Sequence, residues 1–267
     1  MKRCCIIHNT EKEIAIDFFQ KVKGFLKERE VEILEIDELE LLDFAVIIGG
    51  DGTLLRAAKI LVKNPKIDII AINAGSLGFL TEISIEDGLN AIGRYLKGDY
   101  QVKSRRLLEI GLKDKVYDAL NEVVISKGGV MTKLLRIGVY SDGEYMNTYR
   151  ADGLIISTPT GSTAYSMAAG GPIVTPGLKA LVLTPIAAHN LTARPVVING
   201  DEVLTIKIED EDRIGYAVID GETCAKIHFD DVVTVAYTGK KIKLVLPKEL
   251  NYYGILRETL KWGDKLC

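Results

Sequence analysis

The stretch that decides the fold is Phe44-Ala45-Val46-Ile47-Ile48-Gly49-Gly50-Asp51-Gly52-Thr53. Its apolar start is typical of a buried strand, and residues 54–63 regain the spacing of a helix. Glycines let the backbone approach a ligand closely, and the first turn of a helix offers free N–H groups to an anion. The stretch therefore predicts a strand, a glycine-rich loop and a helix with an anion site at the corner. A tight turn without a ligand is the simpler alternative.

Strand patterns alternate with helix patterns on both sides of this stretch. Such alternation is typical of parallel βαβ units, so we expect residues 1–98 to form an α/β nucleotide-binding domain. Strands are predicted at 3–8, 31–36, 44–48 and 67–73, and helices at 11–30, at 54–63 and from a cap at Ser84 through residue 97.

The pattern changes after about residue 100. Val- and Ile-rich runs alternate with turn sequences, which predicts an antiparallel, β-sandwich-like domain over residues 99–250. Helical spacing returns at 252–262, so we expect 251–267 to pack back on the first domain, with a ligand cleft between the two domains. The turn sequences are Ser141-Asp142-Gly143-Glu144, Asn199-Gly200, Asp220-Gly221 and Thr238-Gly239.

Composition excludes several classes of protein. The chain has 267 residues, a formal net charge of −3 and no dominant Lys/Arg block, which argues against nucleic acid as a partner. Its apolar runs are too short for a secretion signal or a membrane span. Cys4 and Cys5 are predicted to pack as small buried residues, and no cysteine or histidine has zinc-ligand spacing. We therefore expect no structural metal and a cytoplasmic location.

Asp51 is the candidate catalytic residue. A carboxylate beside amides that hold phosphate is unfavourable for simple binding, because like charges repel in a poorly solvated cleft. It suits a group that accepts a proton from an attacking hydroxyl, or that helps hold Mg²⁺ beside the phosphates. Arg56, one turn into the predicted helix, could add a phosphate contact or be a solvated helix residue.

Two familiar nucleotide motifs are absent from the sequence. The third glycine of G-x-G-x-x-G is missing after Gly50-Asp51-Gly52. The P-loop pattern G-x-x-x-x-G-K-[ST] does not occur, and Gly239-Lys240-Lys241 lacks its hydroxyl residue and upstream glycine. The sequence therefore predicts neither a standard dehydrogenase fingerprint nor a P-loop.

A second cluster of candidate residues runs from Asp152 to Ser166. It is a predicted strand leading into Ser157-Thr158-Pro159-Thr160-Gly161-Ser162-Thr163, a turn that can offer hydroxyls and amides to a base or sugar, or act only as a capping turn. Asn121-Glu122 lies within an apolar stretch, where an unpaired polar residue costs roughly 1–3 kcal/mol. Successive strand residues face opposite sides, so both enter one site only if the strand ends or bulges there.

Taken together, these segments resemble the NAD kinase family. The resemblance includes the Gly49–Thr53 loop, Asn121-Glu122 and the Asp152–Ser166 segment, and it extends to three further stretches. These are Asn73-Ala74-Gly75-Ser76-Leu77-Gly78-Phe79-Leu80, Leu191-Thr192-Ala193-Arg194-Pro195 and the tail from Tyr252 to Gly263. The glycine loop alone is shared with lipid kinases, whereas the Asp152–Ser166 segment is more specific.

The resemblance implies a Rossmann-like N-terminal domain and a β-rich C-terminal domain, with NAD bound between them in a homodimer or homotetramer. The implied reaction moves the terminal phosphate of ATP, supplied with Mg²⁺ or another divalent cation, onto the adenosine-ribose 2′-hydroxyl of NAD. Asp51 would accept the proton, with Gly52 beside it, and no residue is assigned as a metal ligand.

The resemblance also assigns the remaining binding residues. Asn121 and Glu122 would contact the ribose, and Thr163, Ala164 and Tyr165 would surround the adenosine, followed along the chain by the ligand contacts Ser166 and Met167. Asp152, Ala168 and Ala187 would lie toward the nicotinamide side, with Arg150 and Thr132 near the ligand.

Three positions depart from the commoner family pattern. Glu222 follows Asp220-Gly221 where Gln is frequent, Ala168 stands where Ser is frequent, and Ala187-Ala188-His189 replaces Cys-Pro-His. None of them touches the proposed base. The alternatives are a lipid or sphingoid kinase, which would need an apolar acyl groove, and a dinucleotide sensor without catalytic activity.

Overall fold

The computed structural model describes residues 1–76, 78–128, 133–190 and 192–262. The chain forms two compact units. Unit 1 comprises Met1–Arg105 and Lys241–Cys267, and unit 2 comprises Arg106–Lys240. Both borders fall inside long strands, β6 (Gln101–Leu112) and β17 (Val232–Leu246), so two extended strands connect the units covalently.

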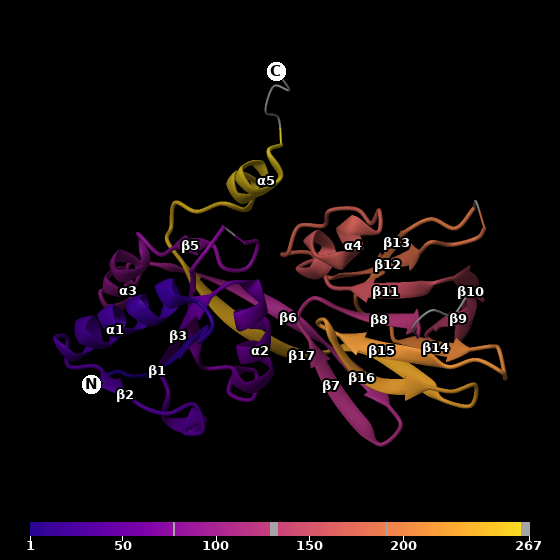
Figure 1. The fold of residues 1–267 in the computed structure, drawn as a ribbon, viewed down its shortest axis with the longest axis horizontal. Coiled ribbons are helices and arrows are strands. Elements are labelled where there is room, and N and C mark those ends of the chain that lie inside the picture. Colours follow the sequence, from indigo (N-terminus) through magenta and orange to yellow (C-terminus); the bar gives the residue numbers. More distant parts are fainter. Residues whose placement is uncertain (77, 129–132, 191, 263–267) are drawn as a thin grey trace. The chain divides into compact units, whose positions relative to one another are not determined.

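Unit 1 is built on a parallel sheet with the strand order β4-β3-β1-β2, of which Figure 1 labels β1, β2 and β3. Val46 pairs with Ile6 on one side and with Ile70 on the other, so β3 is central and buried along its length. The parallel arrangement is confirmed, but the second predicted strand shrinks to two residues. The bounds are β1 Arg3–His8, β2 Glu32–Ile33, β3 Phe44–Gly49, β4 Asp68–Asn73 and β5 Ile83–Ser84.

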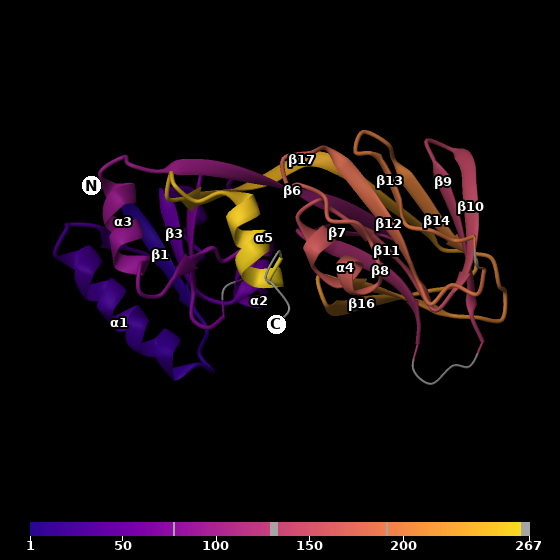
Figure 2. The ribbon, with the colours of Figure 1, turned by 90° about the horizontal axis from the view of Figure 1, so that it is seen from above.

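The α-helices among the described residues of unit 1 are α1 (Glu13–Lys27), α2 (Asp51–Leu61), α3 (Gly88–Leu96) and α5 (Tyr252–Leu260). Figure 2 shows α1 and α3 on the same side of β1 and β3. Their buried faces share one core with alternate residues of the strands, as a half-apolar helix on a pleated sheet requires.

The predicted cap at Ser84 is wrong. Helix α3 begins at Gly88 with Asp87 at its N-cap, and Ser84 belongs to β5. The Ser84 hydroxyl accepts the N–H of Asp87 at 3.3 Å, so it stabilises the turn before the helix and not the helix itself.

Unit 2 contains two antiparallel sheets that enclose one apolar core, which confirms the expected β-sandwich-like architecture. One sheet has the order β13-β12-β11-β8-β15-β16, and the other contains β10-β9-β14-β17. Its strands are β7 Lys115–Ala119, β8 Glu122–Lys127, β9 Leu135–Ser141, β10 Glu144–Ala151, β11 Gly153–Ser157, β12 Ala180–Ile186, β13 Val196–Asn199, β14 Leu204–Ile208, β15 Gly215–Ile219 and β16 Glu222–Ile227.

The turn predictions have mixed outcomes. Asp220-Gly221 joins β15 to β16 with positive φ at both residues (46° and 82°), which confirms a tight hairpin. Asn199-Gly200 joins strands of different sheets, so it is a turn but no hairpin. Thr238-Gly239 is no turn, because Gly239 lies inside β17 with φ +87°. The glycine sits where β17 changes partners from β14 to β4.

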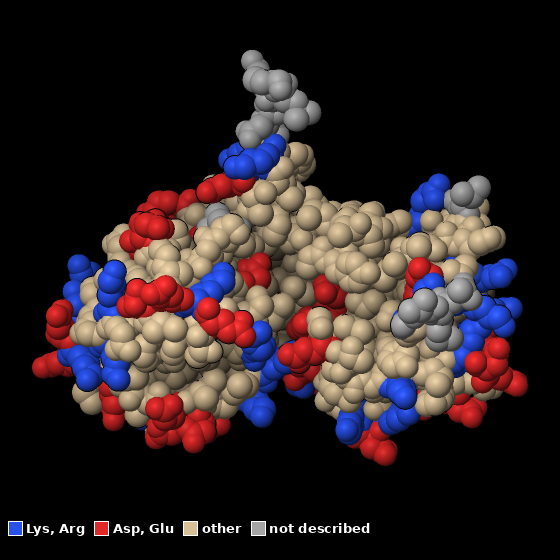
Figure 3. Space-filling model, viewed as in Figure 1, with Lys and Arg blue, Asp and Glu red and all other residues tan. Residues whose placement is uncertain are grey.

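Surface charge in unit 1 is mixed. Figure 3, drawn from the direction of Figure 1, shows Lys and Arg side chains scattered among Asp and Glu over the elements of this unit. Among the described residues, no helix has the length and apolar character needed to cross a bilayer. Cys4 and Cys5 are buried as predicted, and burial raises the pKa of their thiols to about 12 and about 11.

Candidate active site

The glycine-rich loop lies at the carboxyl edge of the parallel sheet. Three parallel strands end side by side there, because the N–H of Asn9 donates to Ile48 O at 2.9 Å and that of Ala74 donates to Gly49 O at 3.0 Å. Loops at this edge are the usual position of ligand sites in α/β sheets. The sequence 73–76 is therefore a direct neighbour of the glycine loop.

Asp51 is the first residue of α2, and its carboxylate is held by four donors. Oδ2 accepts the N–H of Phe79 at 3.1 Å. Oδ1 accepts the N–H groups of Leu80 (3.3 Å) and Thr81 (2.9 Å) and the hydroxyl of Thr81 (2.8 Å). An ionised carboxylate has about four acceptor positions, two on each oxygen. Counting the donors of the described residues, Oδ1 is therefore fully used, whereas Oδ2 keeps a position for another donor.

A side-chain relay fixes this orientation. Asn73 Nδ2 donates to Thr81 Oγ1 at 2.7 Å, so the Thr81 hydroxyl directs its own proton to Asp51 Oδ1. Both side chains are at least 97 % buried, so the relay is shielded from water. The sequence analysis assigned no role to Thr81. The polar pair Thr81-Glu82 within the largely apolar run 79–85 could have indicated one, because buried polar residues need partners.

Glycine is required at two positions around this carboxylate. A Cβ on Gly78 would lie 2.2 Å from Asp51 Oδ1, and one on Gly49 would lie 2.3 Å from Thr53 Oγ1. A Cβ on Gly50 or Gly52 would meet nothing within 4 Å. The backbone at the start of α2 is therefore open to a ligand.

The start of α2 has the character of an anion site. Gly50 is its N-cap and provides no side-chain cap bond, so the first N–H groups of the helix are left for other partners. Arg56 is exposed on the same helix, which is compatible both with a phosphate contact and with a solvated helix residue.

In unit 2, Asn121 and Glu122 lie where β7 ends and β8 begins. Asp220, in the β15–β16 turn, accepts the N–H groups of Leu120 (2.8 Å), Asn121 (2.9 Å) and Glu122 (3.1 Å). Consecutive residues of a continuous strand face opposite sides of the sheet. Because the chain is not in a strand between Ala119 and Glu122, the side chains of Asn121 and Glu122 can serve one site. Asp220 holds this break between the two strands in place, a role that sequence reasoning missed.

The hydroxyl-rich segment packs directly on this pair. The N–H of Thr158 donates to Asn121 O at 2.8 Å, and its hydroxyl donates to Leu120 O at 2.7 Å. A Cβ on Gly161 would lie 2.2 Å from Asn121 O, so only glycine permits this approach. Ser157 pairs in register with Glu122. The two predicted motifs of unit 2 therefore form a single site.

Three polar atoms at this junction have no hydrogen-bond partner among the described residues. They are Asn121 Oδ1, Glu122 Oε2 and Ser157 Oγ, and each residue is at least 92 % buried. An unsatisfied buried polar group costs about 1–3 kcal/mol, so three in adjacent positions make this junction a candidate site for a polar ligand. Ser157 was within the predicted segment but was not singled out.

Burial also changes the protonation of this site. It raises the pKa of the Glu122 carboxyl from 4.5 to about 8, with a further contribution from the charge of Asp220. Glu122 is therefore mostly protonated at neutral pH and can both donate to and accept from a ligand hydroxyl.

The raised pKa predicts a pH dependence of stability. Between pH 4.5 and about 8 the folded chain holds a proton on Glu122 that the unfolded chain has lost, so the free energy of unfolding should fall as pH rises through this window. The contribution of this group is at most about 1.4 kcal/mol per pH unit. Urea unfolding of wild type and Glu122→Gln between pH 5 and 9 measures it. The variant should show a flatter profile, and identical slopes would contradict the assignment.

A second group of predicted residues lies at the opposite end of β11. The N–H of Asp152 donates to Ile186 O at 3.0 Å, next to Ala187, and Arg150 O accepts the N–H of His189 at 2.9 Å. Asp152 is paired with Lys127 at 2.6 Å. Arg150, Asp152 and Ala187 are thus brought together, apart from the Asn121–Glu122 junction at the far end of the strand.

The short helix α4 (Tyr165–Ala168) contains most of the remaining candidates. Ser166 is buried and shares a 2.8 Å hydrogen bond with Thr184, which indicates a structural contact. Thr163 is 93 % buried, whereas Tyr165 is about half exposed and available to a ligand. Ala164 and Met167 are partly exposed, and Ala168 is exposed. Thr132 lies outside the described residues.

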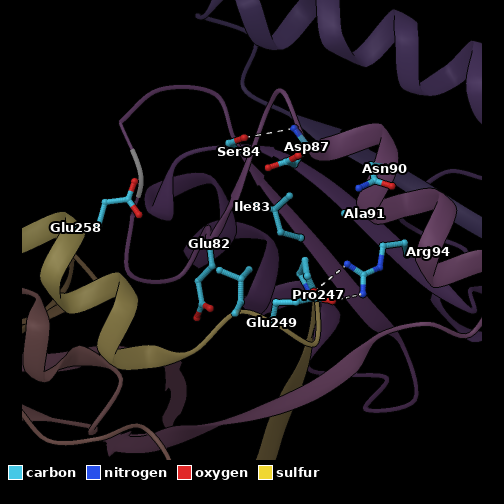
Figure 4. A pocket seen from close by; sticks show the side chains of 11 residues that line it. Glu82, Ile83, Ser84, Asp87, Asn90, Ala91, Arg94, Pro247, Glu249 and Glu258 are labelled. Atoms are coloured by element: carbon cyan, nitrogen blue, oxygen red, sulfur yellow. Dashed lines mark hydrogen bonds and ion pairs between the residues drawn. The ribbon is translucent and has the colours of Figure 1, made fainter.

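Unit 1 also contains a pocket that the sequence did not predict. Its volume is about 410 Å³, and Figure 4 shows its lining, in which Arg94 is joined to Glu249. Asp87, Glu249 and Glu258 give the lining an acidic character that disfavours a polyphosphate. The lining also includes Glu82, which directly follows Thr81, one of the residues that hold the Asp51 carboxylate.

A parallel α/β unit with a fixed carboxylate beside a helix N-terminus, and a β unit that holds unsatisfied polar groups, are features that suit a nucleotide-dependent phosphotransferase. Comparison with protein families shows this class directly. The ATP-NAD kinase N-terminal domain matches residues 8–100, and the ATP-NAD kinase C-terminal domain matches residues 120–246. The chain belongs to the NAD kinase family.

Individual relatives agree with this assignment. The chain is 41% identical to the NAD kinase of Fusobacterium nucleatum over 268 residues, covering all of both chains, and 36% identical to that of Clostridium botulinum strain Loch Maree, covering 100% of this chain and 99% of the relative. Lipid kinases are thereby set aside as the family.

Two solved structures share the fold. The Archaeoglobus fulgidus NAD kinase in complex with ATP has a TM-score of 0.80 at 26% identity, covering 96% of this chain and 99% of that one. Yeast NADH kinase complexed with NADH has a TM-score of 0.92 at 21% identity, covering 100% and 89%.

Proposed function

We propose that this protein transfers the γ-phosphate of ATP to the adenosine-ribose 2′-hydroxyl of NAD, with Asp51 as the general base. The proton of the 2′-hydroxyl passes to Asp51 Oδ2, and the 2′-oxygen forms a bond to the γ-phosphorus. The bond between that phosphorus and the β–γ bridging oxygen breaks, which gives NADP and ADP. The observation that supports this proposal is the cradle of four donors from the described residues, which leaves Oδ2, and not Oδ1, with an acceptor position for the substrate.

Catalysis then consists mainly of positioning and of neutralising charge, as in phosphoryl transfer generally. ATP enters with Mg²⁺ as a single substrate complex. Its phosphates lie against the first N–H groups of α2, where the backbone at Gly50 and Gly52 is open, and Arg56 extends the same surface. Any further Mg²⁺ contact of Asp51 would compete for the acceptor position on Oδ2.

The acceptor NAD contacts the residues along β11 in unit 2. The adenosine end takes the unsatisfied groups of Asn121, Glu122 and Ser157, with Thr163, Ala164 and Tyr165 beside them. The nicotinamide end lies toward Arg150, Asp152 and Ala187. Gly153 and Ser157 are four strand steps apart, roughly 13 Å at about 3.3 Å per residue, a spacing suited to an extended dinucleotide.

Exposed apolar residues and buried thiols support a proposal on the assembly and the location of the protein. We propose a homodimer or homotetramer that works in the cytoplasm. Val197 and Leu178 are 48% and 57% exposed near the edge strand β13, which offers apolar surface for a second copy. The buried thiols of Cys4 and Cys5 suit a reducing compartment.

The direct test is incubation of the purified protein with NAD, ATP and Mg²⁺, followed by an enzymatic assay for NADP. We expect NADP formation that stops when ATP is omitted or when excess EDTA removes the divalent cation. Parallel reactions with polyphosphate as donor and NADH as acceptor define specificity. Tight NAD binding without NADP formation would instead support the dinucleotide sensor.

A further inference from the structure

The segment that cradles Asp51 is continued by a buried charge. Thr81 supplies two of the four hydrogen bonds to the Asp51 carboxylate, and Glu82 is the next residue. Ile83 then begins β5, which pairs with Ile72 of β4. Thr81 lies near the end of the loop that joins β4 to β5. Gly75 and Ser76, at the start of this loop, are exposed, whereas Glu82 is buried. We therefore expect the orientation of the Thr81 backbone to depend mainly on how Glu82 is held.

Glu82 is held by an ion pair inside unit 1. Arg105 Nη2 lies 3.2 Å from Glu82 Oε1, and only 7% and 3% of the two side chains are exposed. Burial raises the pKa of Glu82, Arg105 acts against this rise, and the charge of Asp51 adds to it. The two carboxylates are thus close enough to repel each other, and Arg105 compensates one of them.

Stability alone is a weak reason for this pair. Replacing a buried ion pair by well-packed apolar residues is often neutral or even stabilising. Arg105 Nε also lacks a partner among the described residues, although Tyr252, the first residue of α5, lies near enough to influence the guanidinium. A costly and incompletely satisfied charge pair directly behind the cradle of Asp51 calls for a functional explanation.

We propose that the Glu82–Arg105 ion pair is a positioning element, which fixes Thr81 and so keeps Asp51 Oδ2 directed at the substrate hydroxyl. The inference rests on the proposed function of Asp51. Neither residue contacts substrate in this account. Their loss should therefore lower kcat and leave the KM values for NAD and ATP nearly unchanged.

The test compares wild type with the apolar double variant Glu82→Leu/Arg105→Met, which removes both charges and leaves no unpaired one. We expect a loss of kcat of about 10-fold or more, with both KM values within threefold and the melting temperature nearly preserved. Glu82→Gln keeps an acceptor for Arg105 but loses the negative charge, so we expect a smaller, two- to fivefold loss of kcat. The matched control is Lys243→Met, which removes the ion pair to Asp68 (2.8 Å) elsewhere in unit 1 and should leave kcat unchanged.

Each result separates the two claims. A double variant with wild-type kcat would overturn the positioning role, whereas a wild type that forms no NADP would remove the proposed function instead. If the double variant fails to fold, Glu82→Gln decides. A two- to fivefold loss of kcat at unchanged KM then supports the role, and wild-type kcat overturns it.

Discussion

Asp51→Asn is expected to reduce NADP formation by roughly 10²–10⁴-fold, the usual contribution of a positioned general base. The amide is nearly the same size as the carboxylate and still accepts at Oδ1 from Leu80 and Thr81. It cannot take the proton of the 2′-hydroxyl, and its NH₂ group would face the N–H of Phe79. NAD affinity should stay within a few-fold, because the proposed NAD-binding groups lie in unit 2. Turnover at saturating substrates and calorimetric titration of NAD measure the two effects.

The control for Asp51→Asn is Asp87→Asn, which removes an exposed carboxylate in the same unit that makes no side-chain cap bond to α3. It should keep wild-type turnover. Near-normal turnover in Asp51→Asn itself would remove Asp51 from the role of base. A parallel loss of NAD affinity would indicate a binding role.

Gly78→Ala is expected to lower kcat on the order of 10²-fold, although it neither removes nor adds an ionisable group. The added Cβ would lie 2.2 Å from Asp51 Oδ1 and 2.8 Å from Oδ2, so the carboxylate must move by an ångström or so. A misplacement of about 1 Å is enough for a loss of this size. Because the clash meets the end of a side chain and Gly78 is only partly buried, the melting temperature should change little. Steady-state kinetics and thermal unfolding on one preparation check both expectations.

Gly24→Ala is the matched control for this substitution. Gly24 lies in α1, where a Cβ meets nothing within 4 Å, and alanine favours a helix over glycine by about 1 kcal/mol. The control should be neutral or slightly stabilising at full activity. Wild-type kcat in Gly78→Ala would mean that the observed carboxylate position is not the one used in catalysis.

The parts of unit 1 that follow from local pattern were predictable from sequence. The run from Phe44 into the glycine loop predicted β3, the loop and α2, because an unbroken apolar strand and helical spacing are both local signals. The second strand was overestimated, since Val31, Leu34 and Ile36 look apolar in sequence but only Glu32–Ile33 finds a pairing partner in β1. Thr238-Gly239 was wrongly predicted to be a turn. A glycine can also lie inside a long strand, here β17, where the strand changes its pairing partner.

The candidate site was predictable as a set of segments but not as a set of contacts. Asn121 and Glu122 stood out because polar residues within an apolar run need a reason. Asp51 stood out because a carboxylate in a glycine-rich loop suited to phosphate is unfavourable for simple binding. The donors that hold Asp51 are backbone N–H groups of residues 79–81, and every sequence has backbone N–H groups. Arg105 is likewise separated from Glu82 by 23 positions, so only the folded chain shows that the two charges are paired.

A crystal structure of the protein with NAD bound tests the central claim most directly. The decisive quantity is the distance from the adenosine 2′-oxygen to Oδ2 of Asp51. The account predicts a hydrogen bond of about 2.6–3.2 Å, with the four protein donors to the carboxylate still in place. A 2′-hydroxyl directed to any other side chain, with Asp51 more than about 5 Å away and no bridging water, would contradict it.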